Sequence, residues 1–219
     1  MKIFLDTANI ASIEQLISTG LVDGVTTNPT HLSKEKQSPT VVAKKICSLL
    51  PKGIISVEIT QQEPEKVYEQ AKKIAALAPN IAVKIPCFEP YFPIIKKLVR
   101  SGVVLNITLV FSVSQALALC KLGVAYVSPF IGRLDDAGKN GIEVLYSIVD
   151  MVQMYGYKTQ VLAASVRSQE HIEQIIASGA HCMTLPIELF ETMLVHPLTT
   201  KGMTQFDADW KELKVNKFP

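Results

Sequence analysis

Short apolar segments rich in branched side chains recur along the chain, separated by longer stretches that mix polar and apolar residues. Continuous apolar runs of this length, bounded by polar or turn-forming residues, are typical of buried β-strands. The segments are Lys2–Leu5, Gly24–Thr26, Ile54–Ile59, Ile81–Ile85, Val104–Leu109, Tyr126–Ser128, Gln160–Ala164 and Cys182–Leu185. The pattern therefore predicts eight strands.

The stretches between the predicted strands have the spacing of surface helices. Their apolar residues recur every three or four positions, as in Ile10, Ile13, Leu16 and Ile17, or in Val67, Ala71, Ile74 and Leu77. Such one-sided stripes indicate helices that cover a sheet. Capping residues support this interpretation: Ser112 and Gln115 have capping-box spacing, and glycines follow three helical stretches, at Gly102, Gly123 and Gly179.

Strands that alternate with helices, joined by connections too long for hairpins, predict a parallel sheet with helices outside it. Eight such units in 219 residues fit an α/β fold with one domain, a (β/α)8 TIM barrel over residues 1–219. An open doubly wound sheet is the alternative. It is disfavoured because no Gly-x-Gly-x-x-Gly turn follows the first predicted strand.

An extra C-terminal amphipathic helix is predicted at residues 203–216, after the eighth unit. Phe206, Trp210 and Leu213 fall on one of its faces. An apolar face beyond a complete barrel suggests a lid or a contact between subunits, and we expect it at a subunit interface.

Composition and charge narrow the class of protein. With 48% apolar residues, a chain of this length can bury roughly 70% of its unfolded surface. The 22 basic residues are interleaved with 20 acidic ones, which argues against a nucleic-acid partner. The most apolar stretch, Val103–Cys120, is interrupted by polar residues, so no membrane span is expected. Widely spaced cysteines without a CxxC pair suggest reduced thiols and a cytoplasmic protein.

Polar side chains interrupt or follow the predicted strands near their carboxyl ends, where the active sites of barrels lie. They are Asp6, Asn28, Glu58, Lys84, Asn106, Thr108, Ser128, Ser165 and Arg167. Lys84 stands out because it lies within an otherwise apolar segment. Desolvation in the barrel interior would favour a neutral amine that attacks a carbonyl as a Schiff-base nucleophile. A lysine that only forms a salt bridge, with Glu58 for example, is the alternative.

Other polar residues have both a chemical and a structural interpretation. Asp6 could act as a general acid and base or cap the first helix, and Asn28 could bind substrate or form a turn. Arg133 and Arg167, together with Ser165, could bind a phosphate, or the two arginines could be solvated surface residues.

Metal binding is not predicted. The four histidines occur singly, without His-x-x-x-His spacing. Asp135 and Asp136 are adjacent and lack the spacing of metal ligands, so a solvated loop is the expected interpretation.

Six sequence motifs now point to a known family: Phe4–Asn9, Gly24–Thr30, Val83–Pro86, Asn106–Leu109, Ser128–Arg133 and Leu162–Arg167. Together they make the chain resemble, from end to end, the small single-domain members of the transaldolase and fructose 6-phosphate aldolase family. The resemblance implies a (β/α)8 barrel whose Lys84 forms a Schiff base with the C2 carbonyl of a ketose phosphate. It implies no metal and no organic cofactor.

The resemblance also implies roles for individual residues. Asp6 would take the proton of the C4 hydroxyl as the C3–C4 bond breaks, while Glu58 and Thr108 would position a water that assists imine formation and hydrolysis. The residues that would hold the dihydroxyacetone hydroxyls are Asn28, Asn106 and Ser128. Those that would bind the phosphate are Arg133, Ser165 and Arg167.

The implied activity is transfer of a dihydroxyacetone unit in the non-oxidative pentose phosphate pathway. The donor would be fructose 6-phosphate or sedoheptulose 7-phosphate, and the acceptor erythrose 4-phosphate or glyceraldehyde 3-phosphate. A ring-type homo-oligomer in which the tail helix packs on a neighbouring subunit is also implied. An aldolase-type lyase and a non-catalytic barrel that binds sugar phosphates are the alternatives.

Phe130 and Glu58 favour the transferase over the lyase. In the aldolase relatives these positions hold Tyr and Gln, and a phenyl ring cannot donate a hydrogen bond to a site water, whereas a phenol can. The chain departs from the family pattern at residues Cys87–Pro93, with two prolines and three aromatics, and at His31, where Leu is usual. The unusual loop leaves open which acceptor sugars have access.

Overall fold

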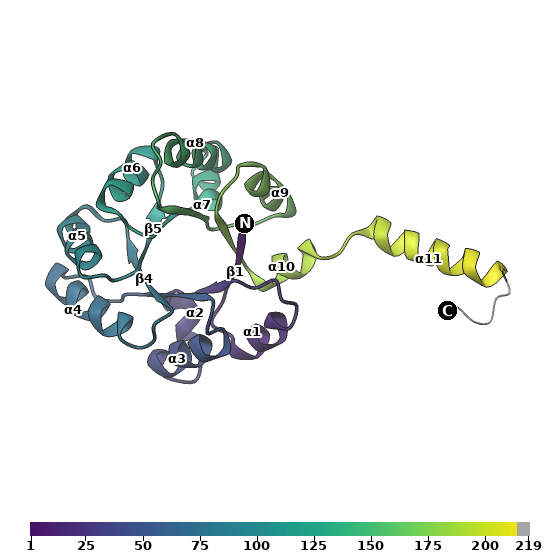
Figure 1. Ribbon diagram of the computed structural model, residues 1–219, viewed down its shortest axis with the longest axis horizontal. Helices are drawn as coiled ribbons and strands as arrows, with labels where there is room; N and C mark the ends of the chain where they lie inside the picture. Colours follow the sequence, from purple (N-terminus) through teal and green to yellow (C-terminus); the bar gives the residue numbers. More distant parts are fainter. Residues whose placement is uncertain (214–219) are drawn as a thin grey trace.

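The computed structural model describes residues 1–213 as a closed barrel of eight parallel strands surrounded by helices (Figure 1). The strands follow one another around the barrel in sequence order, and β8 closes it by pairing with β1. They are β1 (Lys2–Asp6), β2 (Gly24–Thr26), β3 (Ile54–Glu58), β4 (Ile81–Pro86), β5 (Leu105–Val110), β6 (Tyr126–Pro129), β7 (Gln160–Ala163) and β8 (Cys182–Leu185). The predicted barrel is confirmed, and every predicted strand is present.

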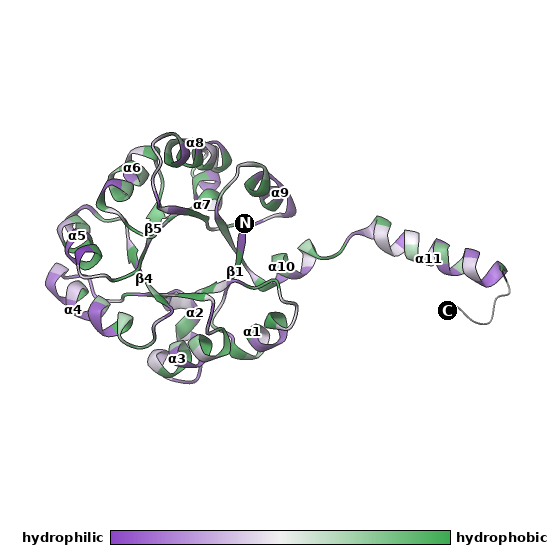
Figure 2. Ribbon diagram, in the orientation of Figure 1, coloured by the Kyte–Doolittle hydropathy of each residue, from purple (hydrophilic) through white to green (hydrophobic). Residues whose placement is uncertain are grey.

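Helices cover the outside of the barrel, with their hydrophobic faces toward the strands (Figure 2). They are α1 (Ile10–Ile17), α2 (Pro29–Ser33), α3 (Pro39–Leu49), α4 (Pro64–Ala75), α5 (Phe92–Arg100), α6 (Val113–Leu122), α7 (Ile131–Asp136), α8 (Gly141–Met154), α9 (Gln169–Ala177), α10 (Ile187–Met193) and α11 (Pro197–Glu212), with a 3-10 turn at Glu89–Tyr91. The predicted cap of α6 is present, because the Gln115 backbone N–H donates to Ser112 Oγ at 3.2 Å.

Alternation along the strands divides the barrel interior into an apolar and a polar part. Phe4, Tyr126, Leu162 and Cys182 are buried together in the apolar part. Gly24 makes room for Phe4, because a Cβ at Gly24 would lie 2.9 Å from its ring. Inward-facing positions nearer the carboxyl ends carry polar side chains, so the barrel opens into a polar site above an apolar floor.

The C-terminal helix is longer than predicted at its amino end. α11 begins at Pro197 instead of residue 203, because Pro197 is favoured in the first turn and the His196 side chain accepts a hydrogen bond from the Leu198 N–H. Residues 214–216 of the predicted helix lie outside the described residues. α11 projects away from the barrel (Figure 1), and none of its described residues is buried.

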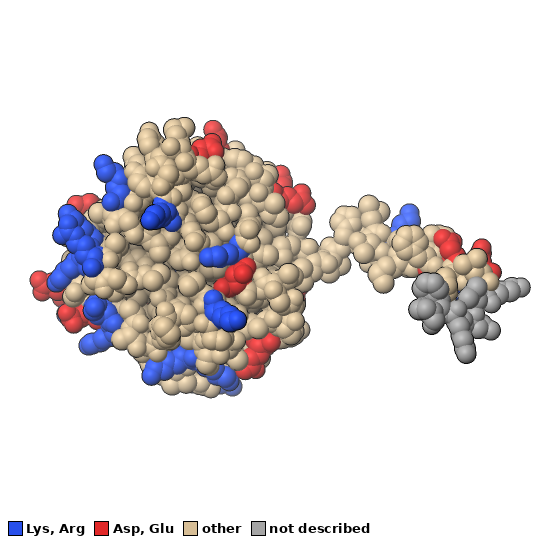
Figure 3. All heavy atoms as spheres, viewed as in Figure 1, with Lys and Arg blue, Asp and Glu red and all other residues tan. Residues whose placement is uncertain are grey.

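Charged residues are dispersed over the surface in view. Lys and Arg side chains lie both at the edge of the barrel and over its middle, and Asp and Glu side chains lie among them (Figure 3). Within residues 1–213, no helix has both the length and the apolar character needed to cross a bilayer.

Candidate active site

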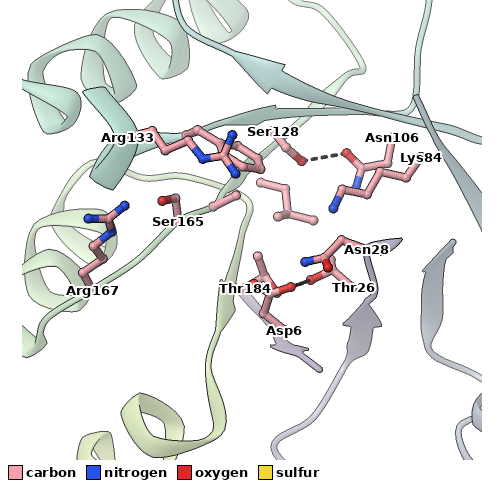
Figure 4. A pocket seen from close by; sticks show the side chains of 13 residues that line it. Asp6, Thr26, Asn28, Lys84, Asn106, Ser128, Arg133, Ser165, Arg167 and Thr184 are labelled. Atoms are coloured by element: carbon pink, nitrogen blue, oxygen red, sulfur yellow. Dashed lines mark hydrogen bonds between the residues drawn. The ribbon is translucent and has the colours of Figure 1, made fainter. Parts of the chain in front are cut away.

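A polar pocket of about 210 Å³ opens at the carboxyl ends of the strands (Figure 4). Most of the predicted site residues line it: Asp6, Asn28, Lys84, Asn106, Ser128, Phe130, Arg133, Ser165 and Arg167. Glu58 and Thr108 do not line the pocket itself. Glu58 contacts Lys84. Thr108 is buried on β5, where it pairs with Pro86, two residues after Lys84 on β4.

Lys84 lies in the barrel interior and is only 5% exposed. Its Nζ donates to the carbonyl oxygen of Thr27 at 3.1 Å and lies 3.1 Å from Glu58 Oε2. The register pairs Glu58 with Lys84 directly across β3 and β4, which explains the contact. The carboxylate offsets the cost of burying the ammonium. The salt bridge that the sequence offered as an alternative for Lys84 is therefore present, and it leaves a carboxylate next to the amine.

A chain of buried hydrogen bonds fixes the side chains beside Lys84. Ser128 Oγ donates to Asn106 Oδ1 at 2.6 Å, and Asn106 Nδ2 donates to Ser56 Oγ at 3.0 Å. All three residues are essentially inaccessible to solvent. Their hydrogen bonds orient the amide and the hydroxyl toward the space next to Lys84, where they can contact a bound polyol.

Thr108 has an unusual environment. Its Oγ1 is the buried side-chain oxygen without a hydrogen-bond partner among the described residues. The next residue, Leu109, has a φ of 57°, and the pairing of β5 with β6 shifts register there. Such irregularities re-aim side chains near functional sites, and buried hydroxyls without a partner are uncommon in proteins. The position suits a site for a bound water.

Asp6 lies on the wall of the pocket opposite Asn106 and Ser128, where two threonine hydroxyls form hydrogen bonds in series with it (Figure 4). Thr26 Oγ1 donates to Asp6 Oδ1 at 2.9 Å and lies 2.6 Å from Thr184 Oγ1. Burial raises the pKa of Asp6, but the contacts with His31, Lys84 and Thr26 outweigh it, and the pKa lies below its ordinary value. Asp6 is therefore a carboxylate at neutral pH and can accept a proton.

The sequence offered a structural role for both Asp6 and Asn28, and the structure shows such a role only for Asn28. Asp6 does not cap α1, because Asn9 is the capping residue. Asn28 does cap α2: its Oδ1 accepts the backbone N–H of His31 at 2.8 Å. The same side chain also lines the pocket, so the cap fixes the amide where a substrate could contact it.

Arg133, Ser165 and Arg167 lie together on the side of the pocket away from Lys84 (Figure 4). Ser165 has a φ of 60°, a strained conformation for a non-glycine residue at the end of β7. Gly132 makes the arrangement possible, because a Cβ there would lie 2.4 Å from the Ser165 carbonyl oxygen and 2.7 Å from Arg167 Nε. Two guanidinium groups and a hydroxyl on one wall suit a phosphate.

Asp135 and Asp136 are exposed to solvent, as the sequence predicted, but they end α7 instead of lying in a loop. Each also has a specific partner. Arg167 forms a bidentate pair with Asp136 at 2.5 and 2.6 Å. Asp135 accepts the Gly141 N–H at 2.8 Å and lies 3.3 Å from His171 Nε2. Chain spacing did not reveal the pairs with Arg167 and His171 because they join α7 to the segments after β7.

The loop after β4 adopts an ordered conformation despite its unusual sequence. Tyr91 is buried, and its hydroxyl donates to the Gln62 carbonyl oxygen at 2.8 Å, while Phe88 packs edge-on against it. Cys87 lies at the start of the loop, and burial raises the pKa of its thiol to about 11. The thiol is therefore protonated at neutral pH and does not compete with Lys84 as a nucleophile.

All four cysteines lie within the described residues and are free thiols, as predicted. In residues 1–213, no three His, Cys, Asp or Glu side chains come together in a way that could hold a metal ion.

Three polar residues in or next to the pocket were not predicted from the sequence: Thr26 and Thr184, which line it, and His31, which contacts Asp6. The two threonines face inward from β2 and β8, and strand parity with Asp6 could have found Thr26, which pairs with it. His31 lies on α2, and its Nε2 is 3.6 Å from Asp6 Oδ1. No local signal linked His31 to Asp6.

Comparison with known proteins assigns the chain to a family. The family model for transaldolase/fructose-6-phosphate aldolase matches residues 3–217. The chain belongs to this family. A probable transaldolase of Dehalococcoides mccartyi is 47% identical over 98% of this chain and 100% of its own. One from Lactiplantibacillus plantarum is 43% identical over 99% and 100%, and a probable transaldolase 2 of Listeria monocytogenes is 42% identical over 96% of each chain.

Among solved structures, the fold is shared more widely than the family. Thiamine phosphate pyrophosphorylase from Pyrococcus furiosus matches with a TM-score of 0.59 at 16% identity, over 84% of this chain and 85% of its own. At this identity the similarity concerns the barrel fold alone. Family membership and the transaldolase relatives together indicate an enzyme of the transaldolase type.

Proposed function

We propose that the protein transfers a dihydroxyacetone unit from a ketose phosphate to an aldose phosphate through a Schiff base on Lys84. The donor is fructose 6-phosphate or sedoheptulose 7-phosphate, the acceptor is erythrose 4-phosphate or glyceraldehyde 3-phosphate, and the reaction belongs to the non-oxidative pentose phosphate pathway. The observation that carries the proposal is the enclosed Lys84 amine, 3.1 Å from the Glu58 carboxylate, in a pocket whose other end carries two arginines.

Imine formation begins when Glu58 takes a proton from the Lys84 ammonium. The free amine then attacks the C2 carbonyl of the ketose phosphate, and one proton moves from the attacking nitrogen to the C2 oxygen to give a carbinolamine. Protonated Glu58 returns its proton to the same oxygen, which leaves as water. The buried Thr108 hydroxyl, which lacks a protein partner, is available to hold this water beside Glu58. The product of this step is a protonated imine, which is the electron sink for cleavage.

Cleavage breaks the C3–C4 bond. Asp6 accepts the proton of the C4 hydroxyl, the O–H electron pair forms the C4 carbonyl, and the C3–C4 electron pair moves into the imine to give an enamine. The pKa of Asp6, which is lower than usual, keeps the carboxylate ready for this proton. When an acceptor aldehyde enters, the enamine attacks it and Asp6 returns the proton to the new C4 oxygen. Water then hydrolyses the imine and frees Lys84.

The two ends of the pocket suit the two ends of the sugar. Asn106 and Ser128 lie beside Lys84 and contact the hydroxyls of the dihydroxyacetone portion. Arg133, Ser165 and Arg167 hold the phosphate of the aldose that leaves and then of the aldose that enters. Because the phosphate belongs to the exchanged portion, the enamine stays on Lys84 while the aldoses exchange.

Transfer requires that the enamine wait for an aldehyde instead of taking a proton from water. Phe130 lines the pocket and packs between Phe111, 6.2 Å away, and the Arg133 guanidinium, 5.2 Å from its ring. A phenyl ring in this position cannot orient a water for proton donation to the enamine. This favours transfer over release of free dihydroxyacetone.

Borohydride trapping tests the proposal. Reduction in the presence of fructose 6-phosphate should attach a three- or six-carbon adduct to the peptide that contains Lys84, as seen by mass spectrometry. The Lys84→Arg variant keeps the charge but should give no adduct. An unmodified Lys84 peptide in the wild-type protein would favour a barrel that only binds sugar phosphates. Rapid turnover of fructose 6-phosphate without any acceptor would favour the lyase.

A further inference from the structure

His31 has a contact that the proposed reaction does not use. It lies in the short helix α2, where its backbone N–H is held by Asn28, and its ring reaches back toward the end of β1. Nε2 of the imidazole is 3.6 Å from Oδ1 of Asp6, and the two side chains are 27% and 26% exposed. An imidazole at this distance attracts the carboxylate whenever it is protonated.

Asp6 separates two hollows. One is the substrate pocket, and the other has a volume of about 400 Å³ and is lined by Asp6, Asn9, His31, Lys34, Glu35 and Glu188, among others. The second hollow is open to solvent at His31. The carboxylate that faces the substrate on one side therefore meets an imidazole and solvent on the other.

We propose that His31 is a positioning residue that holds Asp6 in its ionised form at mildly acidic pH and so extends activity toward lower pH. The inference rests on the proposed function in one respect, namely that Asp6 accepts the proton of the substrate hydroxyl. The imidazolium acts through Asp6 and does not touch the substrate pocket, because His31 lines only the second hollow.

Other charged and polar groups also lie near Asp6. Lys84 faces it from β4 across the pocket, and its charge lowers the pKa of Asp6. β2 and β8 contribute only the hydroxyls of Thr26 and Thr184. From α2 and α10, Lys34, Glu35 and Glu188 line the second hollow. Of the groups in the described chain that change charge near neutral pH, His31 is the one paired with Asp6.

The direction in which the pH profile should move follows from the contact between His31 and Asp6. When the His31 imidazole is protonated, its charge stabilises the Asp6 carboxylate and opposes protonation of Asp6. Removal of the imidazole raises the pKa of Asp6, so the acidic limb of kcat/KM moves to higher pH. Because both side chains are partly exposed, the expected displacement is about 0.5 to 1 pH unit, less than for a fully buried pair.

The first experiment compares pH profiles of kcat/KM for fructose 6-phosphate. His31→Leu should displace the acidic limb upward, and His31→Gln, which keeps a neutral donor, should give an intermediate displacement. Lys34→Met is the matched control: it removes a cation from the same hollow without a contact to Asp6, so its limb should coincide with that of the wild type. Equal limbs in all four proteins, or equal displacements for Lys34→Met and His31→Leu, would overturn the proposal.

The second experiment does not depend on activity. In a histidine NMR titration of the ligand-free protein, the midpoint of His31 should move to lower pH in Asp6→Asn, because coupling between two sites is reciprocal. His171, His181 and His196 serve as internal references that should not move. An unchanged His31 midpoint would overturn the inference.

Trapping on Lys84 distinguishes a failure of the His31 inference from a failure of the proposed function. If the wild-type protein forms the adduct and the pH limb does not respond to His31, the inference fails while the proposed function stands. If no adduct forms, the proposed function fails, and the NMR titration still decides whether His31 and Asp6 are coupled.

Discussion

Lys84 and Thr108 illustrate how individual side chains decide the chemistry of this barrel. A lone ammonium in the barrel interior would be costly to bury, and the Glu58 carboxylate beside it offsets that cost. In the proposed reaction, the same carboxylate carries the proton during imine formation. Thr108 differs from Lys84, because its buried hydroxyl has no hydrogen-bond partner among the described residues. Such a hydroxyl lowers the stability of the fold unless a bound molecule forms a hydrogen bond with it.

Replacement of Thr108 by Val should separate activity from stability. The variant removes a hydroxyl without a protein partner and keeps the shape, so the melting temperature should stay equal or rise slightly. If the hydroxyl holds the water of imine formation, kcat should fall about 10- to 100-fold. Steady-state kinetics and thermal unfolding on the same sample measure both.

Thr159→Val is the matched control for that variant. Thr159 is equally buried, but its Oγ1 donates to the Val124 carbonyl oxygen at 2.8 Å, away from the pocket. Loss of this bond should lower stability by about 1 kcal/mol and leave kcat unchanged. Wild-type kcat in Thr108→Val would contradict the role of Thr108.

The Phe130→Tyr variant tests the balance between transfer and release. A phenol at this position can donate a hydrogen bond to a water near the enamine, so cleavage of fructose 6-phosphate without an acceptor should increase severalfold. A coupled assay for free dihydroxyacetone measures it, with Phe111→Tyr as the control, since Phe111 packs against Phe130 but does not line the pocket. No increase in Phe130→Tyr would argue against the role of water access.

Backbone contacts between three elements shape the side of the pocket that carries the two arginines. The elements are the ends of β6 and β7 and the start of α7. Gly132 N–H donates to the Ser165 carbonyl oxygen at 3.1 Å, which joins the first turn of α7 to the strained residue after β7. The Arg167 side chain crosses directly over Gly132. The placement of the two arginines therefore depends on backbone contacts as much as on the arginines themselves.

Gly132→Ala should weaken binding of the phosphate end. The new methyl group would meet backbone at 2.4 Å and Arg167 Nε at 2.7 Å, so Arg167 must shift. Loss of a charge-assisted contact of about 1.5 to 3 kcal/mol predicts a rise in KM for fructose 6-phosphate of roughly 10- to 100-fold. Gly202→Ala, where the methyl group meets open space, should leave KM unchanged. Equal KM values in both variants would contradict the prediction.

The molecule as a whole combines a closed barrel with a helix that does not pack on it. α11 extends from the barrel, and it exposes Met203, Phe206 and Leu213 by 67%, 74% and 63%. A helix with apolar residues that its own barrel leaves exposed is expected to gain stability from a further surface. We expect that surface on a second copy of the chain, in a homo-oligomer.

The double variant Phe206→Asp/Leu213→Asp should therefore dissociate the oligomer. Each apolar side chain contributes about 1.5 to 3 kcal/mol when fully buried, and charges at both positions would also have to be desolvated. Sedimentation velocity measures the assembly. Thr204→Asp, on the opposite face of α11, is the control that should assemble normally. A wild-type protein that sediments as a monomer would contradict the expectation directly.

The fold was accessible from the amino-acid sequence because a parallel barrel imposes a strong local pattern. Buried strands must be apolar, and covering helices must have one apolar face, so both kinds of segment can be recognised from the sequence. A polar residue such as Lys84 within an apolar strand stands out for the same reason. Strand parity then places Asn106 and Thr108 on the same interior side as Lys84. Even so, the start of α11 was misplaced, because the capping signal at His196 and Pro197 lies outside its apolar stripe.

The partners of each polar group required the closed barrel. Strand register sets Glu58 against Lys84, and barrel closure brings Thr184 of β8 to Thr26 of β2. The His31–Asp6 pair joins α2 to the end of β1, and the Asp136–Arg167 pair joins α7 to the segment after β7. Local sequence carries hydrophobic periodicity, which depends on neighbours a few residues apart. Contacts between charges depend on the path of the whole backbone, and that path exists only after the strands have paired.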